Sequence, residues 1–195
     1  MNRLISLSLA TAAFLLALPA FAAIEVAGVK FEDKAKVGAA ELQLNGAGLR
    51  NRAFFKVYSI GLYLPEKKNA VDTVLALKGA KRLHIATLRE LTAEQFADAL
   101  VGSIEKNHTE AELAPLKARI EEFKAAILSL NVAPKGSVVM LDWLPESGTR
   151  LSFNGQAKGK DIAGEDFYGA LLKIWLGNHP AQDNLKDALL GSKPQ

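Results

Sequence analysis

Hydrophobic and polar residues alternate with two different periods along the chain, and the period separates predicted strands from predicted helices. Short runs that alternate, or that are rich in aromatic and β-branched residues, predict strands. These runs cover 24–31, 40–44, 52–64, 81–90, 136–145 and 148–155. The last two are separated by a short segment from Pro145 to Gly148, which predicts a hairpin.

Apolar residues at intervals of three and four predict helices between these strands. The longer helices cover 91–107, 109–131 and 164–180, and shorter ones cover 69–79 and 182–191. Thr92, with Gln95 three residues later, forms a capping-box pattern, and Pro115 is expected in the first turn of its main helix. Strands come early and late without strict βαβ alternation. The pattern therefore predicts an α+β domain, in which helices cover one face of a mostly antiparallel sheet.

The first 22 residues have the pattern of an export signal rather than of a folded element. Arg3 precedes an apolar run, Leu4 to Leu18, and Ala20-Phe21-Ala22 fits a small-x-small cleavage site. The run is about 15 residues long, and a membrane span needs roughly 20. We therefore predict cleavage near Ala22 and a periplasmic or secreted protein. Residues 23–195 are expected to form a single domain with no transmembrane segment.

The composition excludes several classes of function. The chain has no cysteine, so it has neither disulfides nor a thiolate for catalysis or metal binding. Its net charge of +3 falls to +2 when Arg3 is removed, and the charges are well mixed. Because there is no basic stripe with interleaved aromatic residues, we expect no nucleic-acid partner. Removing 22 of 195 residues leaves 173, enough to bury a core without cross-links.

Common catalytic and cofactor motifs are also missing. The segment GAGLRN lacks a third glycine and leads into a strand, so it predicts no dinucleotide site. Gly46 and Gly48 are instead expected to let the backbone turn tightly before the strand. His84, His108 and His179 lack ligand spacing, so neither a metal nor a cofactor is predicted. No G-x-S-x-G motif occurs.

Cationic and phenolic residues are concentrated between Arg50 and Tyr63. Both faces of the predicted 52–64 strand carry apolar side chains, which indicates a central strand covered at least partly on both sides. A buried arginine must be paired or must face a ligand. Its planar fork suits a carboxylate, and the Tyr58 hydroxyl could add a second donor. Two interpretations stay open from the residues alone: a structural ion pair from Arg50 to an internal Asp or Glu, or a ligand site at Arg50.

Four segments together resemble the chalcone isomerase-like superfamily, and they are most similar to its bacterial exported branch. They are LNGAGLRNRAFFKVYSIGLYLP, LTAEQFADAL, GEDFYGALLKIWLGNHP and LKDALLG. The resemblance extends over essentially the whole mature chain, from about Ile24 to Gly191. It implies an open-faced β-sandwich, in which a large antiparallel sheet is backed by a layer of helices. A ligand cleft is expected between the sheet and that layer.

The resemblance also implies roles for particular positions. An arginine after the glycine pair holds the ligand in the family's isomerases, and Arg50 matches it. The following strand has a threonine in the isomerases and a tyrosine in the fatty-acid-binding members, where it grips the carboxylate together with the arginine. Tyr58 matches the binders. A tyrosine, a lysine and an asparagine on one helix of the isomerases correspond by spacing to Phe96, Ala99 and Ser103. The titratable groups of the catalytic pattern are therefore absent.

The spacing of the two gripping residues sets a geometric condition. Arg50 and Tyr58 are eight residues apart, which is roughly 26 Å along a straight strand. They can reach one carboxylate only if the chain bends between them, and the bend is expected between Gly48 and Arg52. The family's enzymes have a longer segment at this place.

The leading hypothesis is a non-catalytic, exported protein that binds a fatty acid or a similar apolar carboxylate without a cofactor. Arg50 would supply the counter-charge and Tyr58 a hydrogen bond, with Phe54 and Phe96 in the apolar wall. One alternative is an intramolecular lyase of the chalcone isomerase type with weak or different activity. A second alternative is a structural or interaction module whose cleft is filled by its own side chains.

Overall fold

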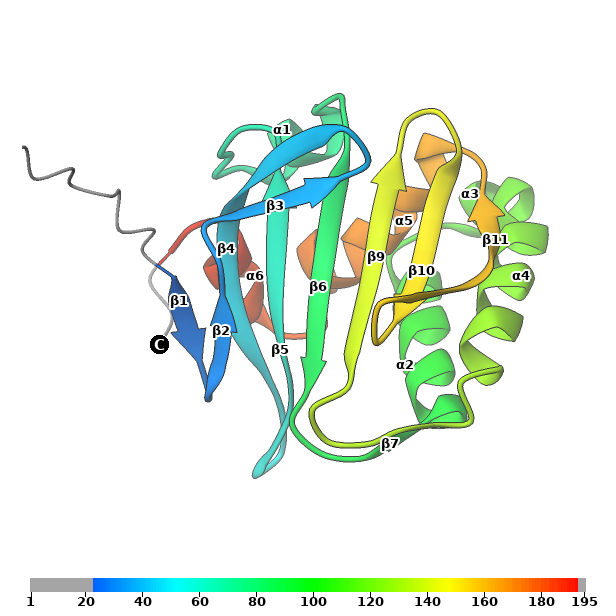
Figure 1. Ribbon diagram of the computed structural model, residues 1–195. Coiled ribbons are helices and arrows are strands. Elements are labelled where there is room, and N and C mark those ends of the chain that lie inside the picture. Colours follow the sequence, from blue (N-terminus) through cyan, green and yellow to red (C-terminus); the bar gives the residue numbers. More distant parts are fainter. Residues whose placement is uncertain (1–22, 193–195) are drawn as a thin grey trace, which may run out of the picture.

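The computed structural model describes residues 23–192, and the predicted signal segment lies outside them. Its main feature is an antiparallel sheet of seven strands in the order β11-β10-β9-β6-β5-β4-β3 (Figure 1). The strands are β3 (Lys34–Val37), β4 (Ala40–Arg52), β5 (Phe55–Leu64), β6 (Lys81–Thr87), β9 (Val138–Leu144), β10 (Gly148–Phe153) and β11 (Gln156–Ile162). Two-residue strands β7 (Leu91–Thr92) and β8 (Val132–Ala133) pair separately.

Helices cover one face of this sheet (Figure 1). They are α1 (Val71–Ala76), α2 (Ala93–Lys106), α3 (Glu110–Leu113), α4 (Lys117–Leu128), α5 (Glu165–Leu176) and α6 (Asp183–Leu189), with a 3₁₀ turn at Ala114–Leu116 that contains Pro115. Thr92 caps α2 as predicted, because its hydroxyl accepts a hydrogen bond from the Gln95 N–H at 3.2 Å. The main core lies between these helices and the sheet, and the buried Trp175 and Tyr168 of α5 are among its largest side chains.

The other face of the sheet is only partly covered. A hairpin of β1 (Ile24–Val26) and β2 (Val29–Phe31) lies beside β4 and closes a second, smaller core around Phe31 and Tyr63. β5 therefore has apolar residues packed on both faces, and the expectation of a central strand is confirmed. The predicted α+β class and the open-faced arrangement are confirmed as well.

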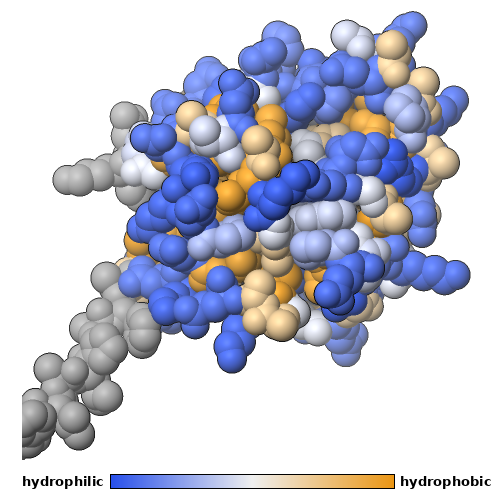
Figure 2. All heavy atoms as spheres, turned by 90° about the horizontal axis from the view of Figure 1, so that it is seen from above, coloured by the Kyte–Doolittle hydropathy of each residue, from blue (hydrophilic) through white to orange (hydrophobic). Residues whose placement is uncertain are grey.

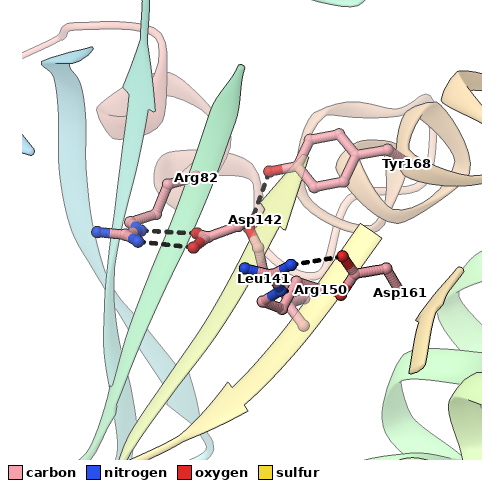
Figure 3. A network of polar contacts seen from close by, with 6 residues as sticks. All are labelled: Arg82, Leu141, Asp142, Arg150, Asp161 and Tyr168. Carbon is pink, nitrogen blue, oxygen red and sulfur yellow. Dashed lines mark hydrogen bonds and ion pairs between the residues drawn. The ribbon is translucent and has the colours of Figure 1, made fainter. Parts of the chain in front are cut away.

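Ionic residues replace apolar ones on the uncovered part of this face (Figure 3). Arg82 of β6 donates two hydrogen bonds to Asp142 of β9, both at 2.6 Å. Arg150 of β10 donates two to Asp161 of β11, at 2.8 and 2.6 Å. Since Arg150 lies directly opposite Asp142, positive and negative side chains alternate across four neighbouring strands. The alternation allows this part of the sheet face to carry charge without like charges meeting across strands.

Two predictions about strands are wrong. The predicted 24–31 strand is the β1–β2 hairpin, which turns at Ala27 and Gly28, both with positive φ. The predicted 52–64 strand begins only at Phe55, because the chain reverses at Ala53 and Phe54. Ala53 has a φ of 52°, a conformation that favours glycine or asparagine, so the residue types give no turn signal there.

Gly46 and Gly48 do not form the tight turn that was predicted. Both lie inside β4, and α6 packs directly on them. A Cβ on Gly48 would lie 2.6 Å from Cδ1 of Leu185, and one on Gly46 would lie 2.9 Å from the carbonyl oxygen of Leu189 and closer still to that of Ala188. The glycines are therefore needed for the close approach of a helix backbone to the sheet.

Candidate functional site

A cavity of about 680 Å³ lies between the sheet and the helix layer at the end of the sheet where β4 turns into β5. Its apolar lining comprises Phe55, Val57, Leu91, Phe96, Leu100, Ile174 and Ala181. Its cationic lining comprises Arg50, Arg52, Arg89 and Lys106, whereas Asp98 is the acidic residue in contact with it. Asp98 lies 3.7 Å from Lys124. The cavity thus combines an apolar wall with an excess of positive charge.

Arg50 and Tyr58 meet in this cavity because of the β4–β5 turn. They are direct cross-strand partners in the β4–β5 ladder, so the condition set by their separation in sequence is met. The bend lies at Ala53 and Phe54 rather than between Gly48 and Arg52, and the expected position of the bend was therefore wrong. Residues on one face of such a pair have Cβ atoms about 5 Å apart. One small group can accordingly contact both side chains.

Arg50 is half-buried and has no carboxylate partner among residues 23–192. Its Nη1 donates to the carbonyl oxygen of Asn51 and to Oε1 of Gln182, the latter at 3.2 Å. The same Oε1 accepts from the Asn51 N–H at 2.8 Å. Neutral oxygens thus orient the guanidinium without cancelling its charge. The internal ion pair considered from the sequence is not present in this part of the chain.

Tyr58 is buried, and its hydroxyl oxygen accepts a hydrogen bond from Nε1 of Trp175 at 2.9 Å. Burial raises the pKa of Tyr58, and the hydrogen bond from Trp175 and the charge of Arg50 offset part of that rise. Tyr58 is therefore a neutral phenol at ordinary pH and retains its proton as a donor. Within the described residues its hydroxyl donates to no acceptor. A hydrogen-bond donor with no acceptor lies next to an arginine with no counter-ion.

The wall contributed by α2 contains no titratable group at the three positions matched to the isomerases. Phe96, Ala99 and Ser103 all line the cavity, so the spacing identified the correct helix face. The Ser103 hydroxyl donates to the carbonyl oxygen of Ala99 at 2.7 Å and is occupied within the helix. Gly102 also lies on this helix, and a Cβ built on it would have no atom within 4 Å. Ala99, Gly102 and Ser103 are therefore small residues that leave space beside Phe96.

The four predicted site residues do not all converge. Arg50, Tyr58 and Phe96 line the cavity, but Phe54 is fully exposed at the hairpin turn and does not line it. The expectation for Phe54 is not met, because the turn reverses the chain at this residue. Phe55, the next residue along the chain, lines the cavity instead.

Sequence reasoning missed two residues that position the site. Trp175 on α5 orients Tyr58, and Gln182, which directly precedes α6, orients Arg50. Trp175 lies within the IWLG segment that carried part of the resemblance. The sequence therefore marked the residue but did not indicate what it contacts. Gln182 offered no signal, because its contact with Arg50 spans 132 positions of the chain.

Among residues 23–192, no group of three or more His, Cys, Asp and Glu side chains is arranged to hold a metal ion. None of the helices in this range has the length and apolar character needed to cross a bilayer.

Comparison with known proteins shows the fold and then the family. A solved structure with the same fold is that of a fatty-acid binding protein from Arabidopsis thaliana, which matches with a TM-score of 0.65 at 14% sequence identity, over 87% of this chain and 96% of that one. Residues 23–191 match the family model described as chalcone isomerase-like. The chain therefore belongs to the chalcone isomerase-like family. No curated protein matches the sequence significantly.

Proposed function

We propose that this protein binds a fatty acid or a similar apolar carboxylate in the cavity beside Arg50, and that it does so without catalysis. The observation that carries the proposal is the pair of donors at one point: within residues 23–192, the Arg50 guanidinium has no carboxylate partner and the buried Tyr58 phenol has no acceptor. A carboxylate can accept from both, and charge-assisted hydrogen bonds of this kind are the stronger ones. The likeness in fold to a fatty-acid binding protein agrees with this function.

The cavity suits the rest of such a ligand. Its volume of about 680 Å³ falls in the range of about 300–1,000 Å³ typical of small-molecule sites. Phe96, Leu100 and Ile174 line it and are themselves buried. An acyl chain that leaves water for this wall gains about 0.8 kcal/mol per CH₂ group. The carboxylate thus fixes the orientation of the ligand, and its acyl chain supplies most of the binding affinity.

The three positions of α2 that match the isomerases argue against that activity. Acid–base catalysis requires a group that can exchange a proton within hydrogen-bond reach of the substrate, and Phe96, Ala99 and Ser103 provide none. Tyr58 carries a phenol, but burial raises its pKa, so the hydroxyl stays protonated at ordinary pH and is not available to accept a proton as a base. We further propose that the chain is exported after removal of residues 1–22.

Calorimetric titration of residues 23–195, which contain every element of the described fold, tests the proposal. Dodecanoate should bind and dodecanol, which has the same chain without the charge, should bind more weakly. Because Arg50 is only half-buried, Arg50→Ala should weaken dodecanoate binding by about 2 kcal/mol, the lower limit for removing one partner of a charge pair. Arg50→Lys keeps the charge but loses the planar fork, and it should recover only part of the affinity.

Lys36→Ala is the matched control, since it removes one exposed positive charge from β3, where Lys36 lies opposite Glu41 at the end of β4 that is remote from Arg50. It should leave binding unchanged. Failure of the wild type to bind any of dodecanoate, palmitate or oleate would refute the proposed function. Binding that is equally tight in Arg50→Ala would show that the ligand lies elsewhere.

A further inference from the structure

The tip of the β4–β5 hairpin exposes two aromatic side chains. Phe54 is 100% exposed and Phe55 is 61% exposed, whereas the other exposed large hydrophobic residues in the described part of the chain, Leu128 and Val132, are below 40%. An aromatic ring held in water is unfavourable unless something covers it in use. The geometry of the turn does not explain a phenylalanine at position 54, because turns favour Gly, Pro, Asn, Asp and Ser rather than aromatic residues.

Positive charge surrounds these rings. Arg52 and Lys56 flank them on the two strands, and the Arg89 guanidinium lies 5.2 Å from the centre of the Phe55 ring in a cation–π contact. None of these three cations forms an ion pair within residues 23–192. The acidic residue next to them in sequence is Glu90, which is exposed. We define the hairpin tip as Arg52, Phe54, Phe55, Lys56 and Arg89.

The hairpin tip is also the edge of the ligand cavity. Arg52, Phe55 and Arg89 line the cavity and are exposed to solvent as well, so the cavity opens where the rings are exposed. The opposite end of the molecule, seen from above in Figure 2, shows mainly hydrophilic residues with apolar ones scattered among them. In Figure 1 the β4–β5 turn extends below the rest of the sheet, so a flat surface could reach it first.

We propose that the hairpin tip docks on the surface of an anionic lipid bilayer and that the cavity exchanges its acyl ligand there. Charge complementarity favours this occupant: phosphate headgroups attract Arg52, Lys56 and Arg89, and the Phe54 ring enters the boundary between headgroups and acyl chains. An acyl chain could then pass from the bilayer into the cavity past Phe55 without crossing open water. The exchange rests on the proposed acyl-binding function, but the docking does not.

Co-sedimentation of residues 23–195 with lipid vesicles tests the docking. The protein should bind vesicles that contain phosphatidylglycerol, bind pure phosphatidylcholine vesicles weakly, and lose binding as salt is raised. Phe54→Ser removes the ring without touching the cavity and should reduce the partition coefficient about tenfold, which corresponds to the burial of one phenyl ring. Lys56→Gln should reduce it about fivefold, the effect of one cation near the surface.

Leu128→Ser is the matched control, since it removes an exposed apolar side chain at the end of α4, outside the hairpin tip. It should bind vesicles as the wild type does. An equal loss in Leu128→Ser and Phe54→Ser would show non-specific adsorption and overturn the proposal. Absence of binding to every vesicle composition would overturn it too, and would point to a protein partner for the hairpin tip.

Two measurements separate this proposal from the proposed function. Calorimetric binding of dodecanoate should be unchanged in Phe54→Ser, because Phe54 does not line the cavity. Transfer of a fluorescent fatty acid from phosphatidylglycerol vesicles to the protein should accelerate with vesicle concentration, and Phe54→Ser should slow it about tenfold, in step with its weaker partition. Vesicle binding without fatty-acid binding would refute the cavity function alone, and normal transfer by Phe54→Ser would refute the docking alone.

Discussion

Gly46→Ala is expected to weaken both the fold and the ligand site, although residue 46 lies outside the cavity. The new methyl group would lie 2.9 Å from the Leu189 carbonyl oxygen and closer still to that of Ala188. Both atoms belong to the helix backbone and cannot rotate away. To restore optimum separations of about 3.5 Å to both oxygens, α6 would have to move back by more than about 1 Å.

The cost can be worked out from the contacts that this shift disturbs. Overpacking against fixed backbone costs about 1–3 kcal/mol. The shift also stretches the hydrogen bond from Nδ2 of Asn45 to the Leu189 carbonyl, now 2.7 Å, which contributes about 1 kcal/mol. Since α6 is a short rigid helix, Gln182 at its start would move with it and release Arg50. We expect a loss of about 3 kcal/mol in the free energy of unfolding.

Urea denaturation followed by circular dichroism measures the stability, and dodecanoate titration of the folded variant measures the site. Affinity should fall about fivefold, which corresponds to one hydrogen bond of about 1 kcal/mol. Gly169→Ala is the control: it lies inside α5 with no atom within 4 Å of the new Cβ, so it should stabilise by about 0.5–1 kcal/mol. A Gly46→Ala variant as stable as the wild type would refute the close-approach argument.

Two further predictions concern the charged and phenolic groups of the sheet. Burial raises the pKa of Tyr63 to about 12 from 10.0, so the unfolded chain loses this proton first. The stability due to Tyr63 is therefore fully present below pH 10 and is lost between pH 10 and about 12. Urea denaturation at a series of alkaline pH values should show a shallower decline in Tyr63→Phe, and identical slopes would contradict the assignment. Asp142→Ala leaves Arg82 without its two hydrogen bonds of 2.6 Å and should lower the free energy of unfolding by about 3 kcal/mol. Replacing Arg82 by Met in the same protein removes the unpaired charge and should restore part of that loss. No recovery in this double variant would refute the ion-pair explanation.

The sequence was sufficient to predict the parts of the fold that depend on local periodicity. The resemblance to the isomerases placed Phe96, Ala99 and Ser103 on one face of a helix, and all three line the cavity, because helical periodicity persists whatever packs against it. The Thr92 cap could likewise be predicted, since its hydrogen bond connects residues three apart. The cap is encoded within a single turn of helix, and the helix face within about two turns.

The β4–β5 turn could not be predicted, because the residues that form it are not turn residues. Ala53 adopts a positive φ at a cost that glycine or asparagine would avoid, and the flanking Phe54 and Phe55 continue the strand-like composition. Nine residues of β4 pair with nine of β5 across it, from Gln43 opposite Leu64 to Arg52 opposite Phe55, and this ladder provides the energy that holds the turn. The turn was thus determined by long-range pairing, which a local pattern does not contain.

The position of Arg50 illustrates how such long-range interactions create the site. A lone guanidinium on a strand would turn toward solvent or toward an acidic neighbour. Here the hairpin turn sets it opposite Tyr58, and Gln182 binds both its Nη1 and the adjacent Asn51 N–H. Gln182 can do this only because Gly46 and Gly48 allow α6 to lie directly on β4. The glycines that resembled a dinucleotide-binding loop in sequence therefore bring in the helix that orients the arginine of the proposed carboxylate site.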